Sequence, residues 1–142
     1  MPIFFNATPS NYEVLQATQQ LVKVLNATPG WLRLFKNFFT PAYASPFSAF
    51  TEANFSGYSP LSLSGAFADP AKQVDGLYAS ATSNFSWMNS GIAAQMVYGY
   101  WISAGVNWYF AGTFASPINL LPSQTLTVSL TWQGLALGLV LP

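Results

Sequence analysis

The sequence contains no cysteine and no histidine. The missing cysteines exclude disulfides, and with no imidazole either, the usual thiolate and imidazole zinc sites are excluded too. The commonest general base and the usual partners of activated nucleophiles are also missing. We therefore expect no enzyme, and we predict no catalytic, cofactor-binding or metal-binding residues and no cofactor.

Charge is nearly as scarce, since charged residues make up 6% of the chain, against about a quarter in ordinary domains. Every charged residue lies between Glu13 and Asp75, and none follows Asp75. The formal net charge is zero, so neither nucleic acid nor an anionic membrane is an expected partner. Such a surface does little to keep a protein soluble and monomeric. The pattern favours a protein that packs against other proteins.

Long apolar runs are also missing, although 51% of the residues are hydrophobic. A membrane-spanning helix needs about 20 consecutive apolar residues. The best stretch, 96–110, is interrupted by Gly99, Ser103 and Asn107, and the stretch 135–141 ends at Pro142. The first residues lack a basic segment followed by a long apolar one, so we expect no signal peptide.

One segment near the start has the pattern of an α-helix. Ser10 and Glu13 form a capping box, and the segment 26–30 contains a proline and a glycine that end the helix. Apolar side chains and one threonine recur on a single helical face: Val14, Leu15, Thr18, Leu21, Val22 and Leu25. We predict an N-terminal arm and amphipathic helix over residues 1–30.

The remainder, residues 31–142, is expected to be a separate β-rich body. Short alternating or apolar runs separated by turn residues predict strands at 31–35, 61–64, 81–88, 96–103, 108–114, 124–130 and 132–141. Residues 104–107 have the composition of a hairpin turn, and 69–76 and 117–122 read as loops. The predicted fold is mainly β, an antiparallel β-sandwich or a jelly-roll-like domain with one N-terminal α-helix.

The carboxylates offer little chemistry. Glu13 caps the predicted helix, while Asp69 and Asp75 lie in an expected loop without a recognised calcium-binding pattern. Glu52 stands alone in an apolar stretch, and a single carboxylate cannot perform paired acid–base hydrolysis. We interpret Glu52 as the partner of Arg33 or Lys36 in a structural ion pair.

Aromatic residues are abundant, at 17% of the chain, and crowd the predicted hairpin. Tyrosine and tryptophan concentrate in protein interfaces, and flat rings can also stack on sugars. With no charged residue nearby to orient sugar hydroxyls, the pattern favours a subunit interface over a glycan platform. The interface candidates are Tyr98, Tyr100, Trp101, Trp108, Tyr109, Phe110 and Trp132.

Several segments resemble a family of small virion-associated proteins of tailed bacteriophages. The resemblance rests on residues 50–58, on the Tyr-Gly-Tyr strand at 97–101, and on the Trp-containing return strand at 108–114 with the proline-bearing loop and strand at 120–128. It extends over about 12–130 and involves structural positions. The family usually carries a charged residue near the tryptophan of the return strand, whereas this chain is neutral there, which favours packing.

The resemblance implies a capsid decoration or cement subunit that binds the outside of a phage capsid and stabilises it. The implied partners are the major capsid protein and further copies of the chain, with a trimer as the favoured form, and the implied location is the virion. One alternative is a fibre module that binds a receptor or host glycan through the aromatic hairpin. Another is a tail or fibre adaptor that attaches through the N-terminal helix.

Overall fold

The computed structural model describes residues 19–20, 22–23, 26, 30–72, 78–133 and 136–140. Most of the predicted helix therefore lies outside the described residues. The described positions 19, 20, 22, 23 and 26 have helical backbone conformation, but no α-helix is delimited within the described ranges. The division of the chain at residue 30 stays a prediction.

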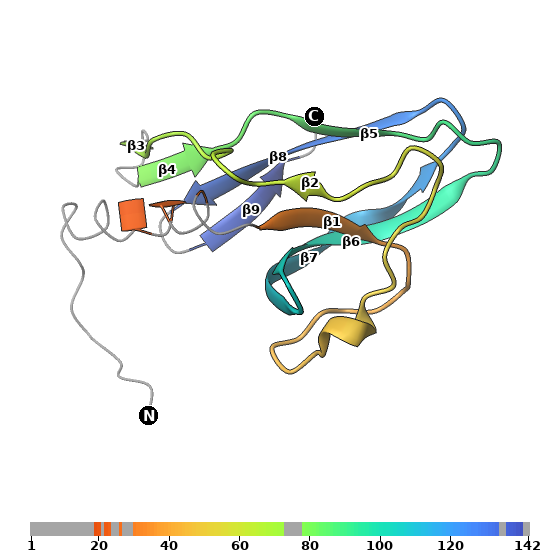
Figure 1. The fold of residues 1–142 in the computed structure, drawn as a ribbon, viewed down its shortest axis with the longest axis horizontal. Coiled ribbons are helices and arrows are strands. Elements are labelled where there is room, and N and C mark those ends of the chain that lie inside the picture. The colour runs from red at the N-terminus through yellow and green to blue at the C-terminus, as the bar shows by residue number, and fades with distance from the viewer. Residues whose placement is uncertain are drawn as a thin grey trace.

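The chain is mainly β, with two antiparallel sheets (Figure 1). The first sheet has the order β2-β1-β6-β7, and the second has the order β3-β4-β8-β5, with β9 also paired to β8. The strands are β1 (Trp31–Phe35), β2 (Leu61–Ser62), β3 (Ala71–Lys72), β4 (Tyr78–Ala81), β5 (Phe85–Met88), β6 (Gln95–Ala104), β7 (Asn107–Leu120), β8 (Thr125–Gln133) and β9 (Ala136–Val140), and a short 3₁₀ helix, η1, covers Phe47–Ala49.

The predicted hairpin is confirmed as β6 and β7, which pair antiparallel around a turn where Gly105 has a φ of 59°. Positive φ is readily adopted by glycine, which explains its place in the turn. The loop expected at 117–122 is wrong in its first part, because β7 runs through Pro117 to Leu120. Proline is tolerated there because β7 is the last strand of its sheet.

The strand predicted at 81–88 is divided in two by Thr82. β4 and β5 pair with successive halves of β8, and at the break the amide of Thr82 donates to Leu130 O at 2.9 Å. The Thr82 hydroxyl accepts a hydrogen bond from the amide of Leu130, also at 2.9 Å. A side chain thus replaces one backbone bond of the ladder at the break between β4 and β5.

One hydrophobic cluster contains buried side chains from both sheets. Leu32 and Leu34 of β1 and Ile102 of β6 belong to it, as do Trp87 of β5 and Val128 of β8. Alternation along each strand sends every second side chain to this cluster. Each sheet therefore has one face toward the shared core and one face directed away from it, called here its outer face.

Asn89 closes one end of the two sheets. Its side chain is fully buried, its amide donates to Ala93 O at 2.9 Å and Leu120 O at 3.0 Å, and its oxygen accepts from Gly91 N at 3.0 Å. Buried amides need such partners. The bonds hold the 89–94 loop in place, although Ile92 within it is fully exposed.

Candidate interaction surface

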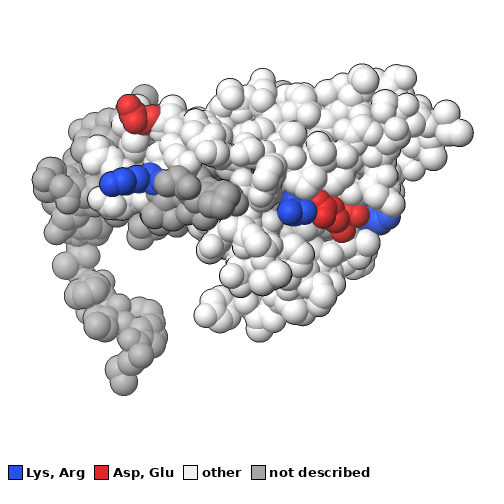
Figure 2. Space-filling model, in the orientation of Figure 1, with Lys and Arg blue, Asp and Glu red and all other residues white. Residues whose placement is uncertain are grey.

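On the face of the molecule that Figure 2 shows, charged side chains lie in two separate places. Lys23 and Asp69 line one groove, while Arg33 and Glu52 form an ion pair on the first sheet. Strands β4 to β9 contain no charged residue. The surface that they contribute can engage a partner without desolvating a charge.

The structure joins Arg33 to Glu52 on the outer face of the first sheet. Arg33 Nη1 lies 2.9 Å from Glu52 Oε1 and 2.8 Å from Oε2, and its Nε donates to the buried Ser103 hydroxyl at 2.8 Å. Lys36, the other cation considered for Glu52, instead donates to Asn54 Oδ1 at 2.7 Å. The pair attaches the segment around Glu52 to β1 and β6.

Tyr58 extends this network into the backbone of β1. Its hydroxyl donates to Glu52 Oε1 at 2.9 Å and accepts from the amide of Leu34 at 3.1 Å. Burial, opposed by the Leu34 bond and reinforced by the nearby Glu52 carboxylate, raises the pKa of Tyr58 well above its ordinary value. The hydroxyl therefore stays protonated at neutral pH and works as a structural link.

Beside this network lies an aromatic cluster built around Trp101. Its ring stacks on Phe50 with centroids 4.8 Å apart, and Phe35 and Phe47 contact it at 6.3 Å each. Trp101 is only 1% exposed. Its indole N–H is buried without a hydrogen-bond partner in the described part of the chain. The cluster is a small second core on the outer face of the first sheet.

Several residues expected at a subunit interface belong instead to the interior. Tyr100 packs in the shared core and Trp101 in the aromatic cluster, and both are buried. Side chains buried in their own chain cannot contact a second subunit, so an interface role for these two does not fit. Phe110 packs against the shared core, and Tyr98 and Trp108 pack against the aromatic cluster. Of the candidates, Tyr109 is the most exposed; the side chain of Trp132 lies outside the described ones.

The aromatic cluster is covered by a loop, residues 37–50, that projects from the first sheet (Figure 1). At its base, Asn37 donates to Ala49 O at 2.8 Å and accepts from Thr51 N at 2.8 Å. Nearer its tip, the indole of Trp108 donates to Ser45 O at 2.8 Å. These bonds and the buried ring of Phe50 hold both arms of the loop.

The same loop also directs two aromatic rings outward. Phe38 is 86% exposed, with an edge contact to Tyr98, and Tyr43 is fully exposed at the tip. The sequence-based interface candidates do not include this loop, since they lie on the later hairpin and at Trp132. The available signal was a charge-free run of aromatics between Pro41 and Pro46 and on both sides of them.

The outer face of the second sheet has a different chemistry. Ser86 and Met88 of β5 lie opposite Thr127 and Thr125 of β8, and the hydroxyls of Ser86 and Thr127 are 2.9 Å apart. Met88 is half exposed, while its neighbour Trp87 points into the core. Along β5 and β8, this face is an uncharged surface of hydroxyls and one thioether. Its hydroxyls can donate or accept hydrogen bonds, and Met88 can contact apolar groups.

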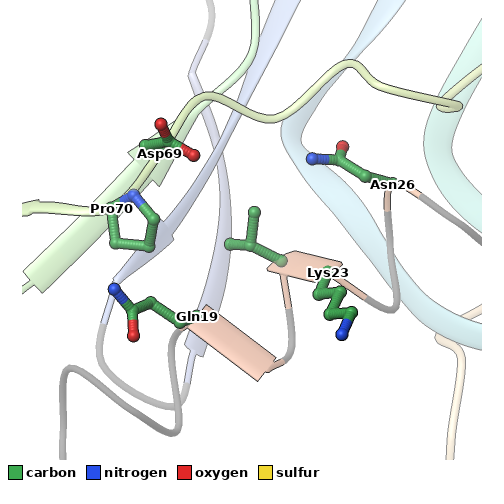
Figure 3. A pocket seen from close by; sticks show the side chains of 6 residues that line it. Gln19, Lys23, Asn26, Asp69 and Pro70 are labelled. Atoms are coloured by element: carbon green, nitrogen blue, oxygen red, sulfur yellow. The ribbon is translucent and has the colours of Figure 1, made fainter.

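An open groove of about 680 Å³ lies where Gln19, Val22 and Lys23 approach Asp69 and Pro70 (Figure 3). Asn26 also lines it, but its side chain is already bonded to both backbone groups of Phe67, at 2.9 Å each. No group of three or more potential metal ligands occurs among the described residues. The described residues that line the groove supply one carboxylate and one ammonium group.

No helix in the described ranges is long and apolar enough to cross a membrane. Comparison with known proteins adds no family: the chain matches no family model, no curated protein and no solved structure. Function must therefore be argued from the surfaces described above.

Proposed function

We propose that this protein is a non-enzymatic structural subunit, a β-sandwich that assembles with copies of itself on the outside of a tailed-phage capsid and stabilises the shell. The observation that carries the proposal is the charge-free surface of β4 to β9 together with the exposed aromatics of the 37–50 loop. Surfaces of this kind lose little on desolvation and gain from apolar contact.

A decoration subunit needs many modest contacts. A stable interface buries about 1,600 Å² in total, and simultaneous attachment of several copies strengthens each of them. Few charges would take part, so attachment is expected to depend weakly on salt. Three copies per oligomer is the form that the resemblance implies, with the major capsid protein as the second partner.

Two measurements test the proposal on particles of the phage whose genome encodes this chain. Quantitative mass spectrometry of purified particles should give hundreds of copies, in a fixed ratio to the major capsid protein. Purified chain should also rebind stripped particles with similar affinity in dilute and in concentrated salt. A steep loss of binding at high salt would contradict a neutral interface, and a few copies per particle would favour the tail or fibre adaptor.

The glycan-binding alternative loses its expected platform. Trp101 is buried, and the indole N–H of Trp108 is occupied by Ser45. Glycan-array binding that disappears in Trp108→Ala but survives in Ile92→Ala would revive this alternative. No matching signal is expected from the wild-type chain.

A further inference from the structure

We infer that the 37–50 loop of one copy docks Phe38 and Tyr43 against the outer face of the second sheet of the next copy, at Ser86, Met88, Thr125 and Thr127. This inference rests on the homo-oligomer of the proposed function and names the two surfaces that make it. The contact joins different patches on the two copies, so it is head-to-tail.

The first support is the loop's fixed shape. The Asn37 bonds close its base and the Trp108–Ser45 bond holds its far arm, while Phe50 is stacked on Trp101. Two prolines, Pro41 and Pro46, further restrict its backbone. A preorganised loop loses little conformational entropy when it binds. Exposed rings on such a loop are suited to be interface anchors.

The second support is the amount of apolar surface left open. Phe38 and Tyr43 are 86% and 102% exposed, and aromatic side chains bury roughly 150–250 Å² each when they are covered. Two such rings on one loop approach the roughly 300–600 Å² of the largest apolar patch on a typical monomer, a patch that is often functional. The same loop directs Phe39 and Phe50 inward. The outward rings of Phe38 and Tyr43 are therefore available to contact a partner.

The third support identifies the partner as another copy of this chain. The loop carries no charge from Asn37 to Phe50, and an ordinary protein surface would present charges that must be desolvated against it. Strands β5 and β8 of the second sheet contain no charged residue. Met88, half exposed there, is a flexible and polarizable contact for aromatic rings, and the hydroxyls of Thr125 and Thr127 can meet the Tyr43 hydroxyl.

The placement of the two patches sets the symmetry. The loop covers the outer face of the first sheet, and the acceptor face belongs to the second sheet, so the shared core lies between them. A contact between two different patches closes into a ring when the rotation between copies permits. A ring of three satisfies both this rule and the trimer that the resemblance implies.

Light scattering coupled to size-exclusion chromatography tests the inference on the full chain. The wild type should elute as a closed oligomer. The double variant Phe38→Ser, Tyr43→Ser should dissociate at a protein concentration at least about thirtyfold above that at which the wild type dissociates, which is the loss typical of a truncated anchor. Ile92→Ser, which removes an equally exposed apolar side chain elsewhere, is the matched control and should keep the wild-type mass. Circular dichroism verifies that each variant is folded.

A second pair of variants tests the acceptor face. Thr127→Lys places a charge under the docked loop and should also dissociate the oligomer, whereas Val106→Lys in the exposed β6–β7 turn should not. Mixing the loop variant with Thr127→Lys restores one intact contact and should yield a species of two copies. Two separate monomers in that mixture would overturn the head-to-tail contact.

The outcomes separate this inference from the proposed function. A wild-type monomer, or loop and Thr127→Lys variants with the wild-type mass, would overturn the docking contact. Rebinding to stripped particles is measured separately with the same variants. If the chain binds particles while these substitutions leave the mass of its oligomer unchanged, the docking contact is wrong and the proposed structural role stands.

Discussion

The two sheets differ in how their outer faces are covered. The first sheet covers its outer face with its own chain, through the 37–50 loop, the stacked Phe50 and Trp101, and the Arg33–Glu52 pair. The second sheet leaves Ser86, Met88 and its β8 neighbours open. The difference shows that uncharged residues have two roles here: the aromatic rings form a second interior on the first sheet, and the hydroxyls and Met88 form an available surface on the second.

Among the variants that test this difference between the two outer faces, Trp101→Ala should have the largest effect. If the outer face of the first sheet is an interior, this change empties the centre of the aromatic cluster and should lower the free energy of unfolding by about 3 to 5 kcal/mol. Urea denaturation of a dilute sample measures the loss. Ile92→Ala, at a fully exposed side chain, should change the stability by no more than about 0.5 kcal/mol.

Gly99→Ala examines the same interior through the backbone. A Cβ at Gly99 would lie 2.1 Å from Gly112 O and 2.6 Å from Phe35 Cζ, so β6 and β7 must separate, at about 1 to 3 kcal/mol or more. Gly112→Ala is the matched control, since its nearest contacts are side-chain atoms of Tyr100, the closest at 2.9 Å. Equal losses in the two variants would contradict the backbone clash.

Tyr58→Phe removes the hydroxyl that links Glu52 to the Leu34 amide. The amide loses its partner, and the expected loss in stability is about 1 to 3 kcal/mol. Thermal denaturation at neutral pH measures it. In a sample dilute enough to be monomeric, a Tyr43→Phe variant, changed at a fully exposed ring, should match the wild type.

Alkaline pH gives an independent measure of Tyr58. Its pKa is raised in the folded chain, so above its ordinary value of about 10 the unfolded chain loses a proton that the folded chain keeps. Stability should therefore fall as pH rises above that value. Burial raises the pKa of Tyr100 as well, so Tyr58→Phe should reduce this slope without removing it. A slope identical to the wild type would contradict the buried position of Tyr58.

The smallest effect is expected on the open face. In a sample dilute enough to be monomeric, Thr127→Val keeps the branched shape that suits a strand and removes only the bond to Ser86. The change in unfolding free energy should stay within about 0.5 kcal/mol, as measured by urea denaturation. A loss comparable to that of Trp101→Ala would show that the second face is as much an interior as the first.

The sequence was sufficient for the parts governed by local pattern. Alternation predicted β1 at its observed bounds, and glycine in a turn between apolar strands predicted the β6–β7 hairpin. Glu52 was considered with Arg33 because few cations exist, and the two are in contact. These inferences needed only periodicity, turn chemistry and the scarcity of charge.

The features that the sequence did not predict depend on which face of each strand is covered and on where the strand lies in its sheet. Tyr100 and Trp101 are neighbours on β6, and alternation sends them to opposite faces, yet both are buried. Periodicity cannot show that a distant loop covers the second of these faces. The interruption of β7 at Pro117 was expected from local preference, but an edge strand can contain a proline where a central one cannot.

The pairing of β1 with β6 has a consequence for synthesis in the cell. Arg33 on β1 bonds to Ser103 on β6, 70 residues later. At about 5 to 20 residues per second, β1 waits roughly 4 to 14 s on the ribosome before its main partner is made. During that interval the side chains of Leu32, Leu34 and Phe35, which are completely buried in the finished fold, stay exposed because β6 and the later strands have not yet been made. A neutral chain gains little protection from charge repulsion, so the yield of native protein should respond to chaperone supply and growth temperature more than its final stability suggests.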